Sequence, residues 1–453
     1  MDTLARQLAR YVLSKRDTDF PHAARSRAVY AMTDCVACIL AGSQEPLADK
    51  LLRVVSRAPH EGGRGLLIGT PDYSTPADAA LYNGALAHAL DYDDSNHPAY
   101  AHPSAVLLPA MLAVSEMADA TGRDFVTSYI LGLEVVGKLG RALQPQHMKQ
   151  GWHATITFGT LAAAVCAGRL LKLTEDQLVM AIGIAGSAAG GWRANFGTMV
   201  KPLHAGYAAR NGVLAALLAR EGFNAAEESI EHKYGYANVL NDGKGVDFLQ
   251  LQCWGEPLEI MTDYGIALKP YPSCGATHTG IEAALLLRTE IGQGAIQSVR
   301  AGVSQLAFEP LILGLPKSPL EAKFSLRYCI SAALTQGAVG LTTFSDRVFA
   351  SPALNELMPR VTMQADERVL HDTEFATVVS IEMADGEKHE KLVPLALGKP
   401  ERWFTEKQLF DKFVDCGELI FDRSRLDEIY GTLCDLDSGA KADRLVTALQ
   451  SAA

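Results

Sequence analysis

The sequence has few cysteines and no long apolar run. Its eight cysteines are spread over 453 residues, which excludes the dense disulfide framework of a small secreted protein. No stretch reaches the roughly 18 uninterrupted apolar residues of a membrane span. Residues 1–10 predict an amphipathic helix that carries an acid and lacks the apolar core of a signal peptide. These absences predict a cytoplasmic protein with reduced thiols and no membrane partner.

An excess of basic residues is also missing. The chain carries 41 Lys and Arg against 52 Asp and Glu, a formal net charge of −11. Such a balance repels phosphate backbones, so we expect no nucleic-acid partner. A small anionic ligand is not excluded, because a pocket can be locally basic in an acidic protein.

One cysteine pair has the spacing of a metal or redox motif. Cys35 and Cys38 lie in the apolar stretch 29–40, which predicts a buried helix, and no second pair is present to complete a zinc site. Free cysteine is among the most buried residue types. We therefore expect both thiols to be structural.

The length predicts two domains. Residues 1–266 predict one helix after another, many of them rich in alanine, whereas residues 267–397 mix helix and strand patterns and residues 398–453 are helical again. The predicted fold class is mainly α, with a large all-helical domain and a smaller α+β domain. Helices are expected in the first part over 76–90, 124–143, 158–171, 175–189 and 205–219.

The middle part carries the strand signals. Residues 299–303 alternate like a strand, and 377–383 and 388–393 predict a hairpin around the Asp385-Gly386 turn. Two helices are expected between them, over 277–289 and 324–337.

Segment 88–104 has an unusual density of titratable side chains between a helix end and two prolines, and it has three interpretations. It contains His88, His97, His102, Asp91, Asp93 and Asp94. One interpretation is a solvated helix end, a second is a metal site, and a third is an acid–base site. Asp91 and Asp93, two apart on what would still be helix, are expected to diverge, and no HExxH or facial-triad spacing is present. We therefore predict no metal.

Two further segments favour an anionic ligand. His153 stands just before a predicted helix, where backbone N–H groups and the imidazole can hold an anion together. Residues 177–220 contain no carboxylate but several cationic or imidazole side chains: Arg193, Lys201, His204, Arg210 and Arg220. Gly197 and Pro202 predict a turn leading into the helix from 205. A buried anion site explains this pattern, and the alternative is that these cations pair with acids elsewhere in the fold.

Two weaker candidates lie in the middle part. Residues 269–278 form a proline-stiffened loop with Lys269 and His278 at its ends, and Tyr328 follows Phe324 by one helical turn. The glycines at 183–191 follow a helix rather than a strand, so they do not predict a dinucleotide-binding turn. No P-loop or GxSxG elbow is present.

Taken together, these segments resemble the MmgE/PrpD superfamily, which contains 2-methylcitrate dehydratases, cis-aconitate decarboxylases and iminodisuccinate epimerases. The matching stretches cover nearly the whole chain in the family's order: HALDYDDSNHPAYAHPS, GWHATITFGT, NFGTMVKPLHAGYAARNG, KPYPSCGATHTG and EAKFSLRY. The resemblance implies a helical domain built from both ends of the chain, a smaller α+β lid, a homodimer, and an active site between the domains. It also implies catalysis without a metal or an organic cofactor.

Carried over position by position, the resemblance places the family's site on seven residues: Asp91, Ser95, His102, His153, Lys201, His278 and Tyr328. Ser95 stands where the decarboxylases have threonine, and the loop before His102 is one residue longer than in their pattern. His102 or His153 is expected to move a proton, Tyr328 to donate one, and Asp91 to orient a neighbour. The remaining expected role is binding of substrate carboxylates, by Lys201, His278, Ser95, His204 and Lys269.

These residues predict a metal-independent lyase, either a hydro-lyase or a decarboxylase, that acts on a small di- or tricarboxylate such as a citrate-like or aconitate-like acid. The alternative is an epimerase acting at a carbon next to a carboxylate. A metal-dependent hydrolase and a non-catalytic carboxylate-binding protein remain as interpretations of other classes.

Overall fold

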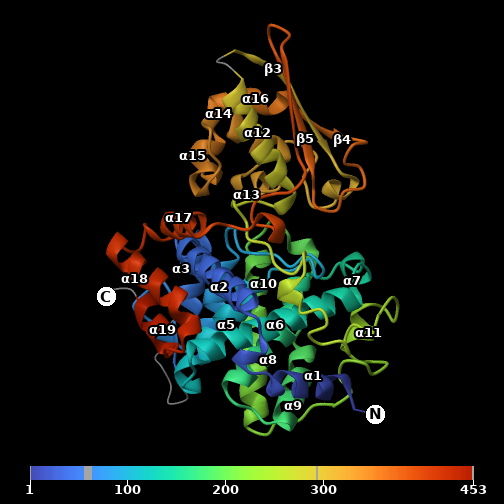
Figure 1. Ribbon diagram of the computed structural model, residues 1–453, viewed down its shortest axis with the longest axis vertical. Coiled ribbons are helices and arrows are strands. Elements are labelled where there is room, and N and C mark those ends of the chain that lie inside the picture. Colours follow the sequence, from blue (N-terminus) through green and yellow to red (C-terminus); the bar gives the residue numbers. More distant parts are fainter. Residues whose placement is uncertain (1, 56–63, 292–293, 451–453) are drawn as a thin grey trace. The chain divides into compact units, whose positions relative to one another are not determined.

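The computed structural model describes residues 2–55, 64–291 and 294–450 and shows a mainly helical protein (Figure 1). The chain divides into two compact units. The first, called here the helical unit, comprises Met1–Leu268 and Phe404–Ala453, and the second, called the mixed unit, comprises Lys269–Trp403. The sequence placed the corresponding boundaries after residues 266 and 397.

Five buried helices form the core of the helical unit. They are α4 (Pro76–Ala87), α5 (Ser104–Ala118), α6 (Gly122–Leu143), α8 (Ala154–Leu170) and α10 (Val200–Arg220). Helix α10 packs against both α4 and α8. A Cβ at Gly206 would lie 2.3 Å from the carbonyl oxygen of Leu81, and a Cβ at Gly212 would lie 2.4 Å from the Cβ of Ala163. These glycines let α10 approach both neighbours closely.

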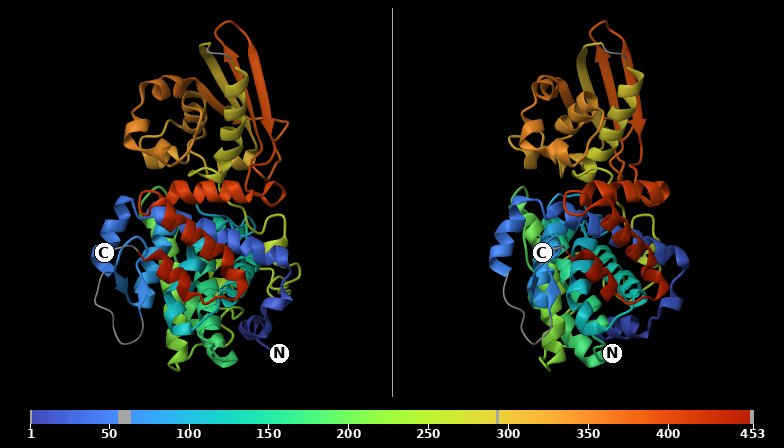
Figure 2. Two further views of the ribbon diagram at one scale, coloured as in Figure 1. Left: turned by 60° about the vertical axis from the view of Figure 1, so that its left-hand side comes forward. Right: turned by 90° about the vertical axis from the view of Figure 1, so that its left-hand side faces the viewer.

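The remaining helices of this unit surround that core. They are α1 (Leu4–Ser14), α2 (His22–Gly42), α3 (Pro46–Val55), α7 (Gln146–Lys149), α9 (Glu175–Ser187), α11 (Tyr236–Leu240), α17 (Glu406–Gly417), α18 (Arg423–Cys434) and α19 (Asp443–Leu449). Helix α17, from the end of the chain, packs on α2, as both views of Figure 2 show. Two short strands, β1 (Gly65–Leu66) and β2 (Tyr73–Ser74), pair antiparallel.

The predicted burial of Cys35 and Cys38 in a helix is confirmed. Both lie inside α2 with no exposed surface, and all eight cysteines are free thiols. Of the helices in the described part of the chain, none combines the length and the apolar character that crossing a membrane requires.

A four-stranded sheet in the order β4-β3-β5-β6 defines the mixed unit. The hairpin of β5 (Thr377–Met383) and β6 (Lys388–Val393) has the predicted bounds, and β3 (Ile296–Val303) contains the predicted strand. Strand β4 (Val361–Ala365), parallel to β3, was not predicted. The helices α12 (His278–Glu290) and α14 (Leu326–Gln336) begin one or two residues after their predicted starts.

The start of α10 corrects one prediction. The helix begins at Val200 rather than at Ala205, so Lys201 and Pro202 both lie in its first turn. Proline was interpreted as a helix breaker, but its missing N–H costs nothing in the first turn. The correction places Lys201 on a rigid element.

Candidate active site

The loop between α4 and α5 is held by a buried carboxyl group. The backbone N–H of Ser104, at the start of α5, donates to Asp94 Oδ1 at 3.1 Å, and the hydroxyls of Ser104 and Tyr129 donate to Oδ2. Burial raises the pKa of Asp94 to about 8, although the hydrogen bonds from Ser104 oppose the shift. Asp94 therefore ties the loop to the helix start and is a neutral acid below pH 8.

A second anchor lies further along the loop. Ser95 and Ala267 exchange two backbone hydrogen bonds of 2.9 Å. The side chain of Asn96 donates to Glu259 at 3.1 Å and to the Gly265 carbonyl at 2.7 Å. The segment that carries the predicted residue Ser95 is thus fixed on both sides.

Two histidines meet in this loop. His88 caps α4, and its Nδ1 lies 2.9 Å from both carboxylate oxygens of Asp93. Because a carboxylate accepts, His88 Nδ1 carries the proton. His88 Nε2 is buried and makes no hydrogen bond within the described residues. The ring of His88 lies 4.4 Å from that of His102 between centroids.

The tautomer of His102 follows from a single contact. Its Nδ1 lies 2.8 Å from the backbone carbonyl oxygen of Asp94, and a carbonyl only accepts, so Nδ1 donates. In the neutral imidazole, Nε2 is then the basic nitrogen. His102 keeps 16% of its side chain exposed, whereas His88 and Asp93 have none. His102 is therefore both basic and reachable.

The starts of α8 and α10 bring three more groups to the same place. His153 stands at the N-cap of α8, and its Nδ1 lies 3.0 Å from Nδ1 of His204, so one imidazole donates and the other accepts. Lys201 Nζ donates to Asp91 Oδ1. The ring of Phe196 packs edge-on against His153 at 4.9 Å and lies 5.6 Å from Lys201 Nζ.

Burial and positive neighbours keep three of these imidazoles neutral. Burial, and next the histidine His88 and the ammonium of Lys201, hold the pKa of His153 well below its ordinary value and lower the pKa of His204 to about 4. Burial also lowers the pKa of His88, although Asp93 opposes it. A carboxylate bound beside these rings would favour their protonation. The cluster can therefore take up both negative charge and a proton.

The acid-free segment around Lys201 is not an unpaired cationic patch. Lys201 pairs with Asp91, and the Arg210 Nε lies 3.3 Å from Asp78. The interpretation in which these cations meet acids from elsewhere in the fold is correct for both. The absence of nearby carboxylates in the sequence is thus no evidence for an anion site. The feature that still favours an anion site is the buried ammonium group of Lys201, which lies among imidazoles.

The predicted divergence of Asp91 and Asp93 is wrong. Helix α4 ends at Ala87, and Asp91 adopts a left-handed backbone conformation with φ of 54°. As a result, one ligand atom from each of four residues lies within 4.8 Å of the others: His88, Asp91, Asp93 and His102. Among the residues described, this is the group that could hold a metal ion.

Those four donors nevertheless fit a metal poorly. Asp91 already binds the ammonium of Lys201, and Asp93 binds Nδ1–H of His88. A metal ion on Asp91 would have to compete with the ammonium group of Lys201 for the same carboxylate, and the two cations would repel each other.

Three predicted site residues belong to the mixed unit and are described there. Lys269 is buried, and His278 Nε2 donates to the Ser273 carbonyl at 3.1 Å, which makes Nδ1 its basic nitrogen. The hydroxyl of Tyr328 donates to the carbonyl of Thr343 at 2.6 Å, and burial raises its pKa above the ordinary value.

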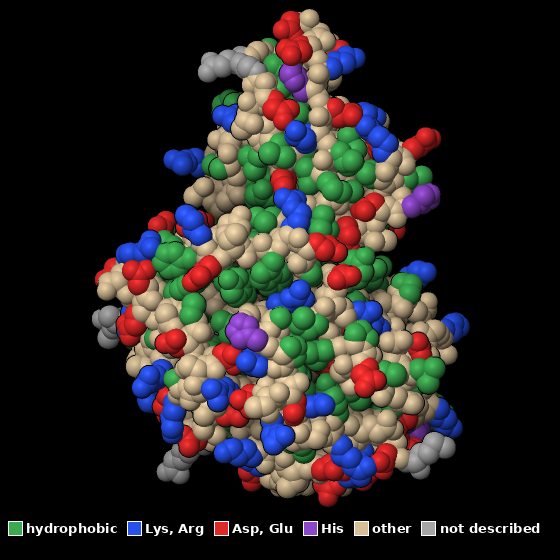
Figure 3. Space-filling view, viewed as in Figure 1, with side chains coloured by type: hydrophobic (Ala, Val, Ile, Leu, Met, Phe, Trp, Pro, Cys, Tyr) green, Lys and Arg blue, Asp and Glu red, His purple; other side chains and the backbone are tan. Residues whose placement is uncertain are grey.

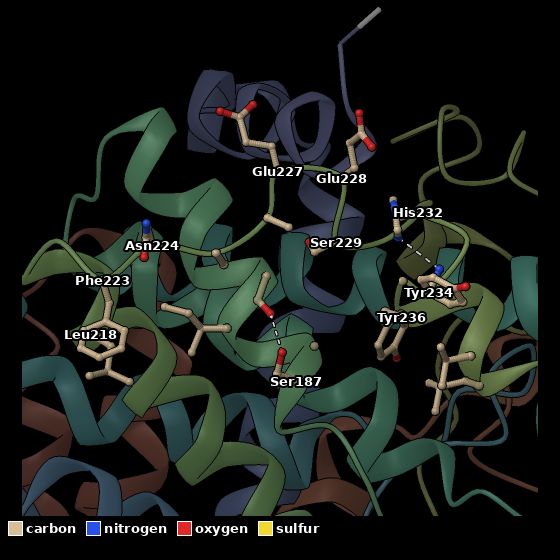
Figure 4. Close-up of a pocket in the computed structure, with 18 residues that line it drawn as sticks. Ser187, Leu218, Phe223, Asn224, Glu227, Glu228, Ser229, His232, Tyr234 and Tyr236 are labelled. Carbon is tan, nitrogen blue, oxygen red and sulfur yellow. Dashed lines mark hydrogen bonds between the residues drawn. The ribbon is translucent and has the colours of Figure 1, made fainter.

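A pocket of about 950 Å³ lies elsewhere in the helical unit, between α9, the end of α10 and residues 223–240 (Figure 4). None of the predicted site residues lines it. Its wall includes Phe223, Tyr236, Glu227 and Glu228 and no lysine or arginine, so it would repel a polycarboxylate. On the face of the helical unit in Figure 3, positive and negative side chains are interspersed.

Sequence reasoning missed His88, Asp93 and Asp94 as site residues. All three lie in the segment whose titratable density was noticed, and that density was the available signal. Their roles depend on partners: Asp93 for His88, and Ser104 and Tyr129 for Asp94.

Comparison with known proteins identifies the family of this chain. The model of the MmgE/PrpD N-terminal domain matches residues 6–249, and that of the MmgE/PrpD C-terminal domain matches residues 271–435. The chain belongs to the MmgE/PrpD family.

The similarity to curated relatives covers most of this chain and most of each relative. The cis-aconitate decarboxylase-like protein of Aspergillus oryzae is 27% identical, with 97% of this chain and 96% of the relative covered. The cis-aconitate decarboxylase of Aspergillus terreus is 28% identical, with 92% and 90% covered. The 2-methylcitrate dehydratase of Cupriavidus necator is 26% identical, with 82% and 81% covered. These MmgE/PrpD relatives carry the names of two different reactions.

Proposed function

We propose that this protein is a metal-independent lyase that acts on a small di- or tricarboxylate by acid–base catalysis. The observation that carries the proposal is the tautomer of His102. Its Nδ1–H is committed to the Asp94 carbonyl at 2.8 Å, which makes Nε2 the base in a cluster that also holds the ammonium of Lys201. The names of the relatives, a decarboxylase and a dehydratase of small carboxylates, support the same class.

One histidine serves either lyase reaction. In a dehydration, His102 Nε2 takes the proton from a carbon next to a carboxylate, the C–H electrons form the alkene, and the hydroxyl leaves with a proton as water. In a decarboxylation, His102 Nε2 first takes a proton from solvent, the C–C bond to the carboxylate breaks, CO₂ leaves with the electrons of that bond kept by the carbon, and the carbon takes the proton from the His102 imidazolium. In both, the ammonium of Lys201 stabilises the charge that builds near the reacting carbon.

Other residues are assigned by the family pattern. We propose that Ser95, Lys269 and His278 bind substrate carboxylates or hydroxyls, that Tyr328 donates a proton, and that His153 is the second proton carrier. Asp91 positions Lys201, to which it is bonded. The partner of His153 in the structure is His204, so His204 fixes the His153 tautomer rather than only binding substrate.

A substrate panel tests the proposal. The purified protein is incubated with cis-aconitate, 2-methylcitrate and citrate, before and after dialysis against a chelator, while CO₂ release, alkene absorbance and optical rotation are followed. We expect CO₂ release or a change in alkene absorbance with at least one acid, unaffected by the chelator. A change in optical rotation alone identifies an epimerase. Loss of activity to the chelator, or binding without conversion, overturns the proposal.

We also propose that the protein is a cytoplasmic homodimer. The family resemblance supports the dimer, and the eight free thiols are compatible with a reducing compartment. Light scattering coupled to size-exclusion chromatography measures the mass directly. A mass of one chain at micromolar concentration would contradict the dimer.

A further inference from the structure

A buried lysine from the C-terminal segment contacts the backbone of the 88–103 loop. Lys412 lies on α17, and its Nζ donates to the backbone carbonyl oxygen of Tyr92 at 2.9 Å. The same Nζ lies 2.6 Å from Asp34 Oδ1 on α2 and 3.7 Å from the centroid of the Tyr92 ring. Three separate parts of the chain therefore meet at one ammonium group.

This ammonium group remains charged. Burial acts to lower the pKa of Lys412, but the carboxylate of Asp34 beside it acts in the opposite direction, and the pKa is raised. Lys412 and Asp34 are 4% and 0% exposed at their side chains. A charged hydrogen bond in such a dry place is stronger and more directional than a neutral one.

The carbonyl that Lys412 holds lies between two residues of the cluster. Tyr92 separates Asp91, which binds Lys201, from Asp93, which binds His88. A peptide group is planar, so fixing the Tyr92 carbonyl also fixes the N–H and Cα of Asp93. The carboxylate of Asp93 then sets His88 and lies 3.5 Å from His102 Nδ1.

The backbone on the other side of Tyr92 needs support. Asp91 has a φ of 54°, a left-handed conformation that costs a non-glycine residue free energy and persists where its surroundings hold it. The hydrogen bond from Lys412 to the next carbonyl is such a restraint. The buried ring of Tyr92 under the same ammonium is a second one.

We infer that Lys412 is a positioning residue for the active site, which acts through the Tyr92 peptide to hold Asp91 and Asp93 in their functional geometry. The inference rests on the proposed function, because it assigns Lys412 to the geometry of that site. Through Lys412, the C-terminal segment of the chain would position residues of the proposed site as well as complete the helical unit.

The test must separate positioning from plain stability. Removing Lys412 alone would leave Asp34 buried without its cation, which destabilises, whereas replacing both by apolar residues of similar size often restores stability. The informative variant is therefore Lys412→Met combined with Asp34→Leu. Lys407→Met is the matched control, because Lys407 lies on the same helix with its side chain 81% exposed.

We expect the double variant to unfold at a midpoint close to that of the wild type, with kcat lowered roughly 10- to 100-fold, as a misplaced catalytic group requires, and KM changed less than kcat. Hydrogen exchange should be faster in a peptide covering residues 89–97 and unchanged in α2 and α17. Lys407→Met should match the wild type in every readout.

Asp34→Asn is the second variant, in case the double variant does not fold. It removes the carboxylate that raises the pKa of Lys412, so the unfolding midpoint should fall. The Lys412 nitrogen can still donate to the Tyr92 carbonyl whether or not it is charged, so kcat and exchange in 89–97 should stay near the wild-type values. Equal losses in Asp34→Asn, or wild-type kcat and exchange in a stable double variant, overturn the inference. If the wild type converts no carboxylate, the proposed function fails, while exchange in 89–97 still decides whether Lys412 holds the loop.

Discussion

The helical unit contains two regions that differ in burial and in charge. One is the polar cluster around His88, His102, His153 and Lys201, and the other is the pocket beside α9. The pocket is large, at about 950 Å³, and includes Glu227 and Glu228 in its wall. The cluster is nearly dry, and it holds an ammonium group and several neutral imidazoles. The size of the pocket makes it a possible ligand site, whereas the side chains suited to binding a carboxylate lie in the cluster.

The largest effect is expected at His102. His102→Gln keeps a hydrogen-bonding side chain but removes the basic nitrogen, so kcat should fall roughly 100- to 10,000-fold. Steady-state kinetics on the best acid of the panel measure it. His97→Gln, in the same loop, is the matched control and should keep kcat close to the wild-type value. Near-normal turnover by His102→Gln would remove it from the mechanism.

The second effect concerns Lys201. Lys201→Met removes the ammonium that stabilises the developing negative charge, and we expect kcat/KM to fall about 100-fold. Arg210→Met on the same helix removes a partly exposed cation paired with Asp78 and should have little effect. Because Lys201→Met leaves Asp91 buried without its cation, the thermal midpoint is measured alongside. Equal kinetic losses in the two variants would mean that general charge, not position, matters.

The third effect is on stability and involves Asp94. Its pKa is about 8 in the fold against 3.8 ordinarily, so between these values the folded protein holds a proton that the unfolded chain has released. The stability from Asp94 is full below pH 3.8 and is lost as the pH rises to 8.

The cleanest measurement is the difference between the wild type and Asp94→Asn. The pKa values of four histidines are also lowered in the fold: His88, His147, His153 and His204. These groups add stability as the pH rises through about 6.5, and their contribution cancels in the comparison. Between pH 5 and 7 the free energy of unfolding of the wild type, relative to that of Asp94→Asn, should fall by about 1.4 kcal/mol per pH unit. Urea unfolding measures it, and a difference that does not change with pH would show that Asp94 is not the group responsible.

The smallest effect is expected in the pocket. Phe223→Ser changes an exposed aromatic side chain of its wall, and kcat/KM for carboxylates should stay within about twofold of the wild-type value, since surface changes away from a site rarely matter. A tenfold change in kcat/KM would show that the pocket, and not only the cluster, handles substrate.

Local patterns in the sequence predicted much of the fold. The β5–β6 hairpin was predicted at its actual bounds, because an Asp-Gly turn between alternating strands is a short-range signal. Strand β4 was missed although its five residues, VTMQA, alternate apolar and polar side chains, because so short a run carries a weak signal.

The site was predicted less completely for a physical reason. The density of His and Asp in 88–104 marked the right segment. The partners that give those groups their roles are distant in sequence, such as Lys201 for Asp91 and Lys412 for the Tyr92 carbonyl. Nothing in a local window shows which histidine nitrogen carries the proton. That knowledge required the Asp94 carbonyl beside His102.

The measurement that tests the central claim most directly is proton transfer itself. The protein and its substrate are incubated in D₂O, and deuterium at the carbon next to the carboxylate is followed by proton NMR. If the enzyme decarboxylates, the wild type should introduce deuterium at that carbon of the product. If it dehydrates, the wild type should introduce deuterium at that carbon of the remaining substrate, because the removed proton exchanges with solvent and is returned. His102→Gln, with wild-type stability, should do neither. Deuterium incorporation by His102→Gln at the wild-type rate would contradict the account.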